Sequence, residues 1–282
     1  MTQIFHEIAE LREHLAAHRL AGRRIGFVPT MGNLHEGHMD LMRASKDQCD
    51  ITVASIFVNP MQFGPNEDFD AYPRTLDEDL AKLDAQGVDY LFAPTVREMY
   101  PDGVNTQIEV PSLGNILDGA SRPGHFTGVA TVVAKLFNIV QSDIAFFGRK
   151  DYQQLAVIKR MVSDLLLPIQ IHGVPTGRAD DGLALSSRNG YLTQDERQVA
   201  PIIYKTLQWA GQQIESGHLD YGQIERDAAE RIQQAGLKVD YFEIRCAENL
   251  TAPGHSQKDL VLLAAAYLGR ARLIDNLEIR AP

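Results

Sequence analysis

The chain has 282 residues, of which 44% are apolar and 23% charged, a composition typical of a globular protein with one large or two modest domains. A formal net charge of −10 argues against a broad nucleic-acid surface, because phosphate backbones are bound by clustered Lys and Arg. No apolar run approaches the roughly 18 residues that a membrane span needs, and the acidic N-terminal residues do not form a secretory signal. We therefore expect a cytoplasmic protein with no membrane or nucleic-acid partner.

The first two thirds of the chain alternate helix-like and strand-like segments. Helices are predicted over residues 4–19, 37–48, 76–86, 126–141 and 151–165. Strands are predicted over residues 24–28, 51–58, 89–93, 143–147 and 169–174. Strands that are apolar throughout and separated by amphipathic helices indicate an α/β domain, with a parallel sheet covered by helices on both faces.

The pattern changes after Thr176. A loop rich in Gly, Asp and Ser covers residues 177–190, and helices are predicted over 194–215 and 221–234. Three late strands follow, at residues 240–246, 260–267 and 272–279. Their connections are short, which favours a small antiparallel sheet in a C-terminal α+β domain. We place the domain boundary at about residue 180, giving domains 1–180 and 181–282.

Two histidines and two glycines follow the strand at 24–28. Gly32 and Gly37 let the backbone approach a ligand closely, and the next helix offers unpaired N–H groups to an anion. His35 and His38 are three residues apart, so both would lie on one side of the first helical turn. A pair of ordinary histidines at a helix start is the alternative. The preceding strand and the following amphipathic helix favour a nucleotide phosphate site.

Three further polar loops each follow a predicted strand, at residues 59–64, 148–154 and 175–189. Ligands of an open parallel sheet bind at the carboxyl ends of its strands, where the strand order reverses. We therefore expect the loops to serve one site. In the first of them, Asn59 and Gln62 carry amides that suit hydroxyl and carboxylate groups. The alternative is a loop whose amides bond only their own backbone.

The other two loops carry cations and hydroxyls. Lys150 beside a helix start is a natural phosphate cation, although a solvated lysine is the alternative, and Asp151 is also a candidate N-cap. Ser186, Ser187 and Arg188 form a compact set of phosphate donors. Arg122, ahead of another helix, is a further candidate contributor.

Together these segments closely resemble the pantothenate synthetase family. The similarity rests on PTMGNLHEGH at 29–38, FVNPMQF at 57–63, KDYQQ at 150–154 and LSSRN at 185–189. The resemblance implies a Rossmann-like domain with a smaller C-terminal domain, in a cytoplasmic homodimer. It also implies the joining of pantoate to β-alanine with ATP and Mg²⁺, through a pantoyl-adenylate, with release of AMP and pyrophosphate. This reaction belongs to pantothenate biosynthesis, on the route to coenzyme A. Because a mixed anhydride exposed to water would hydrolyse, we expect the C-terminal domain to act as a lid.

The resemblance also implies roles for individual residues. His38 would act as an acid and His35 would contact phosphate, with Lys150, Ser186, Ser187 and Arg188 completing the catalytic set. The ATP-binding residues would be Met31, Gly32, Asn33, Leu34, His35, Glu36, Gly37, His38, Gly148, Arg149, Lys150, Asp151, Gly177, Leu185, Ser186, Ser187 and Arg188. Pantoate would be bound by Gln62 and Gln154, and β-alanine by Gln62. The loop pattern adds Asn59 and Arg122 as candidates for binding pantoate. No metal ligand is assigned.

Two positions depart from the family pattern. Arg149 stands where Glu is usual and adds positive charge, and Gly177 stands where a larger apolar residue is common. Glu78 and Asp79 are acidic and close enough in sequence to be considered as metal ligands, but a solvated helix face is the favoured interpretation.

Three other functions are alternatives. An adenylyltransferase acting on a phosphate ester would share the histidine motif but would not need the 59–62 loop. A class I aminoacyl-tRNA synthetase fits a short acidic chain poorly. A nucleotide-binding regulatory module would bind ATP without turnover.

Overall fold

The structure is a computed structural model that describes residues 1–65, 67, 69–254 and 257–282. It divides into two compact units. The first comprises Met1–Arg149 and Val157–Pro175, and the second comprises Lys150–Ala156 and Thr176–Pro282. No helix in the described part of the chain is long and apolar enough to cross a membrane.

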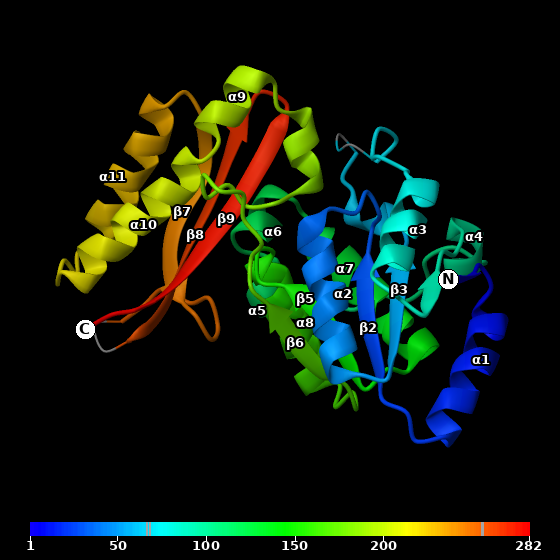
Figure 1. The fold of residues 1–282 in the computed structure, drawn as a ribbon. Coiled ribbons are helices and arrows are strands. Elements are labelled where there is room, and N and C mark those ends of the chain that lie inside the picture. The colour runs from blue at the N-terminus through cyan, green and yellow to red at the C-terminus, as the bar shows by residue number, and fades with distance from the viewer. Residues whose placement is uncertain (66, 68, 255–256) are drawn as a thin grey trace. The chain divides into compact units, whose positions relative to one another are not determined.

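The first unit is built on a six-stranded parallel sheet (Figure 1). Its strands are β1 (Gln3–Phe5), β2 (Ile25–Thr30), β3 (Ile51–Ile56), β4 (Tyr90–Phe92), β5 (Ile144–Gly148) and β6 (Gln170–Val174). The order β1-β4-β3-β2-β5-β6 places the reversal of strand order between β2 and β5. The parallel sheet that the apolar runs predict is confirmed.

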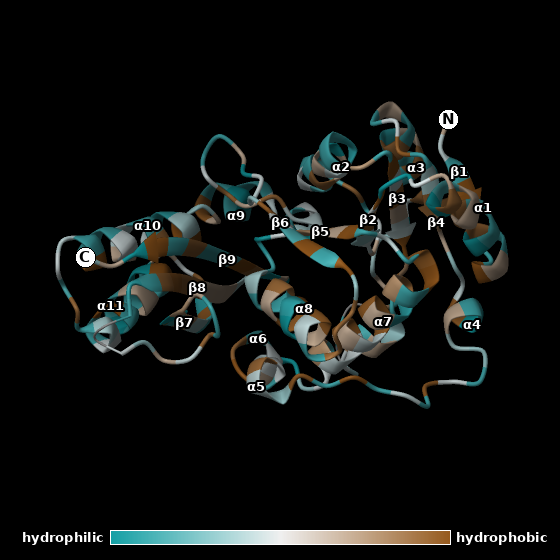
Figure 2. Cartoon of the chain, turned by 90° about the horizontal axis from the view of Figure 1, so that it is seen from below, coloured by the Kyte–Doolittle hydropathy of each residue, from teal (hydrophilic) through white to brown (hydrophobic). Residues whose placement is uncertain are grey.

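Helices cover both faces of this sheet. They are α1 (Ile8–Leu20), α2 (Glu36–Gln48), α3 (Leu76–Ala85), α7 (His125–Val140) and α8 (Tyr152–Asp164). Figure 2 shows α2 and α3 on one side of the sheet, with α7 and α8 on the other. Strand residues such as Phe27, Leu91 and Phe146 are fully buried between these layers. Three short helices precede α7 and were not predicted: α4 (Val96–Met99), α5 (Pro111–Gly114) and α6 (Asp118–Ser121).

Two predicted helices have different bounds in the structure. The predicted helix at 4–19 begins only at Ile8, because Gln3–Phe5 forms strand β1 and pairs with β4. The predicted helix at 194–215 is two helices, α9 (Gln194–Val199) and α10 (Ile202–Glu215). Pro201 separates them, since it has no N–H to donate to a continuous helix.

The second unit contains a three-stranded antiparallel sheet, as expected from the short connections. Its strands are β7 (Lys238–Cys246), β8 (Asp259–Leu268) and β9 (Ala271–Arg280), with β8 in the centre. Helices α10 and α11 (Tyr221–Gln234) pack on this sheet, where Leu207 and Ile232 join Leu262 in one buried cluster. The unit thus has a hydrophobic core of its own.

Candidate functional site

Three neighbouring strands of the first unit end at the same edge of the sheet. Strands β3, β2 and β5 are adjacent and parallel. The carboxyl end of β2 leads into residues 31–38, that of β3 into 57–62 and that of β5 into 148–149. The loops after β2 and β3 are joined directly, because the Phe57 N–H donates to the Thr30 carbonyl at 3.1 Å. The loops after β2 and β3 therefore lie together in the first unit, while a site shared by all four loops stays a prediction.

The two histidines lie against each other at the start of α2. Their ring centroids are 4.1 Å apart, and the His35 backbone N–H donates to Nδ1 of His38 at 3.2 Å. A backbone N–H can only donate, so Nδ1 of His38 is the acceptor and its neutral ring carries the proton on Nε2. His38 therefore has the tautomer that a proton donor requires.

A buried carboxylate shapes the loop in front of these histidines. Asp79 on α3 is fully buried, and it accepts from the N–H groups of Asn33 at 2.8 Å and Leu34 at 2.7 Å. The Thr75 hydroxyl donates to it at 3.1 Å. Lys82 donates to the Leu34 carbonyl at 2.7 Å and lies 3.9 Å from the Asp79 carboxylate. Interpreting Asp79 as part of a solvated helix face was wrong.

Backbone conformation explains why this loop needs its glycine. Gly32 has a φ of +82°, and a Cβ there would lie 3.0 Å from Ile56 and 3.2 Å from Asp79. Asn33 has a φ of +50°, in the left-handed region that few residue types adopt. The loop is therefore held in an unusual shape by a carboxylate that the sequence analysis had assigned to a solvated helix face.

The loop after β3 holds a buried amide pair. Asn59 is fully buried and Gln62 is 8% exposed. Asn59 caps the short helix η1 (Pro60–Gln62) by accepting from the Met61 N–H, as the alternative of a self-bonded loop predicts. Its amide nitrogen also donates to Gln62 Oε1 at 3.1 Å. The sequence missed a third member, Tyr100, whose hydroxyl donates to Asn59 Oδ1 at 2.9 Å.

Arg122 has protein partners that were not expected. Its guanidinium forms a two-pronged ion pair with Glu67, at 2.7 and 2.6 Å, and also donates to the Gln62 carbonyl. Burial raises the pKa of the Glu67 carboxyl, but the hydrogen bonds and charge of Arg122 outweigh this and leave it below its usual value. These contacts show Arg122 joining Glu67 to the turn at Gln62. Its direct binding of pantoate remains a prediction.

His125 at the start of α7 supports the same turn. Its Nδ1 lies 2.8 Å from the Gln62 carbonyl and its Nε2 lies 3.0 Å from Arg122. A carbonyl only accepts, so Nδ1 carries the proton; a guanidinium only donates, so Nε2 is the acceptor and the ring is neutral. Burial, together with the nearby Arg122 charge, lowers the pKa of His125 to about 4. A cavity of about 350 Å³ lies beside this ring, lined also by Met61 and Phe63.

In the second unit, residues 177–185 form a small hairpin. The Leu185 N–H donates to the Gly177 carbonyl and the Ala179 N–H to the Leu183 carbonyl, both at 2.9 Å. Gly182 turns the chain with a φ of +93°. Gly177 thus contributes a backbone carbonyl to the hairpin, a group that any residue at this position would supply.

An arginine anchors the hairpin to β9. Arg178 forms a two-pronged ion pair with Asp275, at 2.6 and 2.9 Å, and donates to the Gly182 carbonyl at 3.0 Å. Its guanidinium also lies 3.6 Å from the ring centroid of Tyr204. Sequence reasoning missed both Arg178 and Asp275, which lie 97 residues apart.

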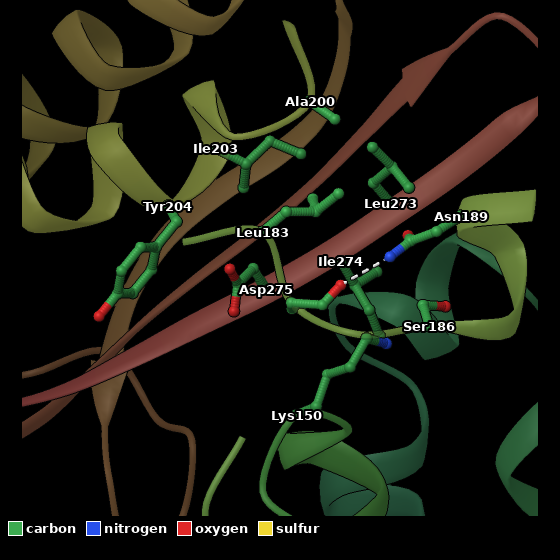
Figure 3. A pocket seen from close by; sticks show the side chains of 11 residues that line it. Lys150, Leu183, Ser186, Asn189, Ala200, Ile203, Tyr204, Leu273, Ile274 and Asp275 are labelled. Atoms are coloured by element: carbon green, nitrogen blue, oxygen red, sulfur yellow. Dashed lines mark hydrogen bonds between the residues drawn. The ribbon is translucent and has the colours of Figure 1, made fainter. Parts of the chain in front are cut away.

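Lys150 and Ser186 line one small pocket beside this anchor, together with Asp275 (Figure 3). Ser186 accepts from the Arg188 N–H at 3.2 Å and caps the short helix η2 (Ser187–Tyr191). The Lys150 backbone is fixed by Asn276, whose amide donates to its carbonyl at 2.8 Å. The predicted phosphate cation and the predicted hydroxyl-rich turn therefore meet in the second unit.

The predicted site residues thus belong to two sets. Those of the first unit are Met31–His38, Asn59, Gln62, Arg122, Gly148 and Arg149. Those of the second unit are Lys150, Asp151, Gln154, Gly177 and Leu185–Arg188. Arg149 donates to the Gly173 carbonyl at 3.2 Å, and Gln154 lies half-buried on the first turn of α8.

Comparison with known proteins identifies the family. The family model described as pantoate-beta-alanine ligase matches residues 3–278. The chain belongs to this family. A pantothenate synthetase of Marinomonas sp. (strain MWYL1) is 57% identical over 277 residues, which are 98% of both chains.

Solved structures of pantothenate synthetases agree with this assignment. The crystal structure of the enzyme from Thermus thermophilus is 44% identical, with a TM-score of 0.93 and coverage of 99% of this chain and 100% of that one. A Francisella tularensis pantoate-beta-alanine ligase, complexed with beta-gamma ATP and beta-alanine, is 36% identical. Its TM-score is 0.83, covering 98% of this chain and 97% of that one. The chain is a ligase that catalyses the ATP-dependent condensation of pantoate with β-alanine.

Proposed function

We propose that the chain carries out this condensation in two half-reactions, through a pantoyl-adenylate. A carboxylate is a poor acyl donor, because its leaving group would be oxide. Attack of the pantoate carboxylate on the α-phosphorus of ATP forms a P–O bond and expels pyrophosphate. The acyl group then carries AMP, a good leaving group.

The activation barrier of the first half-reaction is mainly electrostatic, since an anion must approach a polyanion. Donors and cations held in a water-poor site stabilise the charge that develops on phosphate. We assign this role to His35, His38, Lys150, Ser186, Ser187 and Arg188. The observation that carries the proposal is the histidine loop at the carboxyl end of β2, held by Asp79 with Nε2 of His38 protonated.

The remaining ATP contacts are assigned to the loops themselves. Backbone and side-chain groups of Met31–Gly37, Gly148–Asp151, Gly177 and Leu185 would complete the nucleotide site. A helix start offers N–H donors and a positive dipole end to phosphate, as α2 does after His35. Gln62 and Gln154 would bind pantoate, and Gln62 would also bind β-alanine. Asn59, whose side-chain amide is fully bonded within the protein, would act through Gln62 and not by direct contact.

In the second half-reaction the neutral amine of β-alanine attacks the acyl carbon, the amide bond forms, AMP leaves and the proton lost by the amine passes to a base or to water. A mixed anhydride exposed to water would hydrolyse, so water must be excluded. We propose that the C-terminal domain, residues 181–282, acts as the lid.

Three further assignments belong to the same proposal. Mg²⁺ commonly binds nucleotides through phosphate oxygens and water, and we place it there, neutralising phosphate charge. Among the described residues, no three His, Cys, Asp or Glu side chains are grouped to hold a metal ion. We also propose a cytoplasmic homodimer, whose particle mass in solution would be twice the 31.3 kDa of one chain.

The test is an assay of both half-reactions. Pyrophosphate should exchange into ATP only when pantoate is present, and AMP should accumulate only with both pantoate and β-alanine. Exchange that does not depend on pantoate would indicate another adenylyltransferase. ATP binding without turnover, with all three substrates present, would indicate a regulatory module.

A further inference from the structure

Asn59 uses the whole hydrogen-bonding capacity of its side-chain amide. Oδ1 accepts from the Tyr100 hydroxyl at 2.9 Å and from the Met61 N–H at 3.3 Å. Nδ2 donates to Gln62 Oε1 and to the Gly128 carbonyl, both at 3.1 Å. These four bonds join the loop after β3, helix α7 and the residue that follows α4.

Two backbone groups fix the direction of this amide. The Met61 N–H can only donate and the Gly128 carbonyl can only accept, so the oxygen of Asn59 must face Met61 and its nitrogen must face Gly128. The Tyr100 hydroxyl meets the oxygen and must therefore donate its proton. Burial raises the pKa of Tyr100 to about 12, so this proton stays in place at any working pH.

The direction of Asn59 in turn fixes the direction of Gln62. The Gln62 atom that meets the Asn59 NH₂ group must be an acceptor, which is Oε1. The Gln62 NH₂ group is then at the opposite end of the amide, with both of its hydrogens directed away from Asn59. An amide that turned over would bring two NH₂ groups together, which a fully buried Asn59 could not relieve by bonding to water.

Tyr100 is itself held rigidly. Its ring lies 6.2 Å from that of Phe57 between centroids, and Lys135 Nζ lies 4.8 Å from its ring centroid. Only 8% of Tyr100 is exposed. Its hydroxyl therefore reaches Asn59 from a fixed position on a different part of the chain, 41 residues away.

We propose that Tyr100 and Asn59 are positioning residues that orient the Gln62 amide so that its NH₂ group, and not its oxygen, is presented to the substrates. The inference rests on the proposed binding of pantoate and β-alanine by Gln62. It deepens that function, because it states which chemistry Gln62 recognises. The NH₂ group is a donor, so Gln62 selects the carboxylate and hydroxyl oxygens of these substrates and not the ammonium group of β-alanine.

The first experiment removes the hydroxyl in Tyr100→Phe. Loss of one neutral hydrogen bond should raise KM for pantoate and β-alanine about five- to tenfold. The Kd for ATP, measured without pantoate, should stay unchanged. Tyr90→Phe is the matched control, since it removes a tyrosine hydroxyl that contacts only His18 among the hydrogen bonds described for it. Equal changes in ATP and pantoate affinity in Tyr100→Phe would overturn the proposal.

The second experiment reverses the polarity of Gln62 and needs no change at Tyr100. Gln62→Glu has nearly the same shape, keeps an acceptor for Asn59 and turns an anionic oxygen toward the substrates. It should lose pantoate affinity more severely than Gln62→Leu, which only removes the donors. A Gln62→Glu variant that binds pantoate or β-alanine as well as the wild type would overturn the inferred direction of the amide.

A third readout separates failure of the inference from failure of the proposed function. In ¹⁵N NMR, the Gln62 NH₂ signals, assigned by their loss in Gln62→Leu, should shift when pantoate is added. The Asn59 NH₂ signals should stay in place. If Gln62→Leu binds both substrates normally, Gln62 is not a substrate residue and the proposed function of that residue fails. If Gln62→Leu is impaired but the NH₂ signals do not move, only the orientation is wrong.

Discussion

Asp79 holds the proposed ATP-binding loop in place. It is a buried carboxylate whose two oxygens accept from the N–H groups of Asn33 and Leu34. We predict that Asp79→Asn, which replaces one of these oxygens by an NH₂ group, will raise KM for ATP. An N–H left opposite another donor costs about 1–3 kcal/mol, which is also the expected loss of unfolding free energy. Steady-state kinetics and urea unfolding measure the two effects.

Asp77, two residues before Asp79, provides a control for this substitution. Asp77 lies on the same first turn of α3 but is exposed, so Asp77→Asn should change neither KM for ATP nor the free energy of unfolding. If Asp79→Asn behaved like Asp77→Asn, the carboxylate would not be what holds the loop.

His125 makes stability depend on pH. Burial, with the charge of Arg122, lowers its pKa to about 4 from a usual 6.5. The unfolded chain therefore takes up this proton first as the pH falls, and stability is lost from pH 6.5 down to about pH 4. Between pH 7 and pH 5 the loss from this group should be about 2 kcal/mol.

Urea unfolding of the wild type and of His125→Asn tests this dependence. The asparagine amide can still donate to the Gln62 carbonyl but does not titrate. The variant should therefore lose less stability than the wild type between the two pH values. An equal loss in both proteins would show that His125 is not the group responsible.

The role of a single residue can be predicted from sequence when the residues that define it are close in the chain. His35 and His38 were found because a strand, two glycines and a helix surround them within fifteen residues. Asp79 sits in the run Asp77-Glu78-Asp79, which resembles any solvated helix start, and only the fold buries its third member. Tyr100 acts on a residue 41 positions away, and no spacing rule indicates that contact.

At the scale of elements, α7 packs very closely against the 59–62 turn. A Cβ on Gly128 would lie 2.2 Å from the Met61 carbonyl oxygen and 2.9 Å from the Gln62 nitrogen, which are backbone atoms that no rotamer change can move away. We predict that Gly128→Ala will displace this turn, cost about 1–3 kcal/mol of stability and raise KM for pantoate more than KM for ATP. Thermal unfolding and kinetics with each substrate test this.

A second helical glycine serves as the comparison. A Cβ on Gly222 of α11 would meet only side-chain atoms, at 3.5 Å and beyond, so Gly222→Ala should be tolerated and should favour the helix. Unchanged pantoate kinetics in Gly128→Ala would mean that the turn can yield without affecting the site.

Elements were predictable where they are long and periodic. The predicted strand at 51–58 and helix at 126–141 differ from β3 and α7 by at most two residues at either end. Strand β1 was missed because three residues joined to a helix show no period of their own, and its pairing with β4 depends on residues 87 positions away. The break between α9 and α10 was missed, although Pro201 indicates it, because the apolar pattern continues on both sides of the proline.

At the scale of the whole molecule, the proposed phosphate donors are distributed over two compact units with separate cores. If the C-terminal domain excludes water from the mixed anhydride, binding of ATP and pantoate should shorten the mean distance between the units. We propose spin labels at Glu10→Cys on α1 and Glu230→Cys on α11, both exposed, in a chain in which Cys49 and Cys246 are replaced by Ala. Pulsed electron-spin measurements would compare the free and bound chains.

A label pair within the first unit, at Glu10→Cys and the exposed Asp164→Cys, controls for local changes and should report one distance throughout. The pair across the units should shift only when nucleotide is present, because the anhydride that needs protection forms only from ATP. If the distribution for that pair is the same with and without ATP and pantoate, the C-terminal domain is not a lid. The exclusion of water would then have to come from loops of the first unit, such as the 59–62 turn that Arg122 contacts.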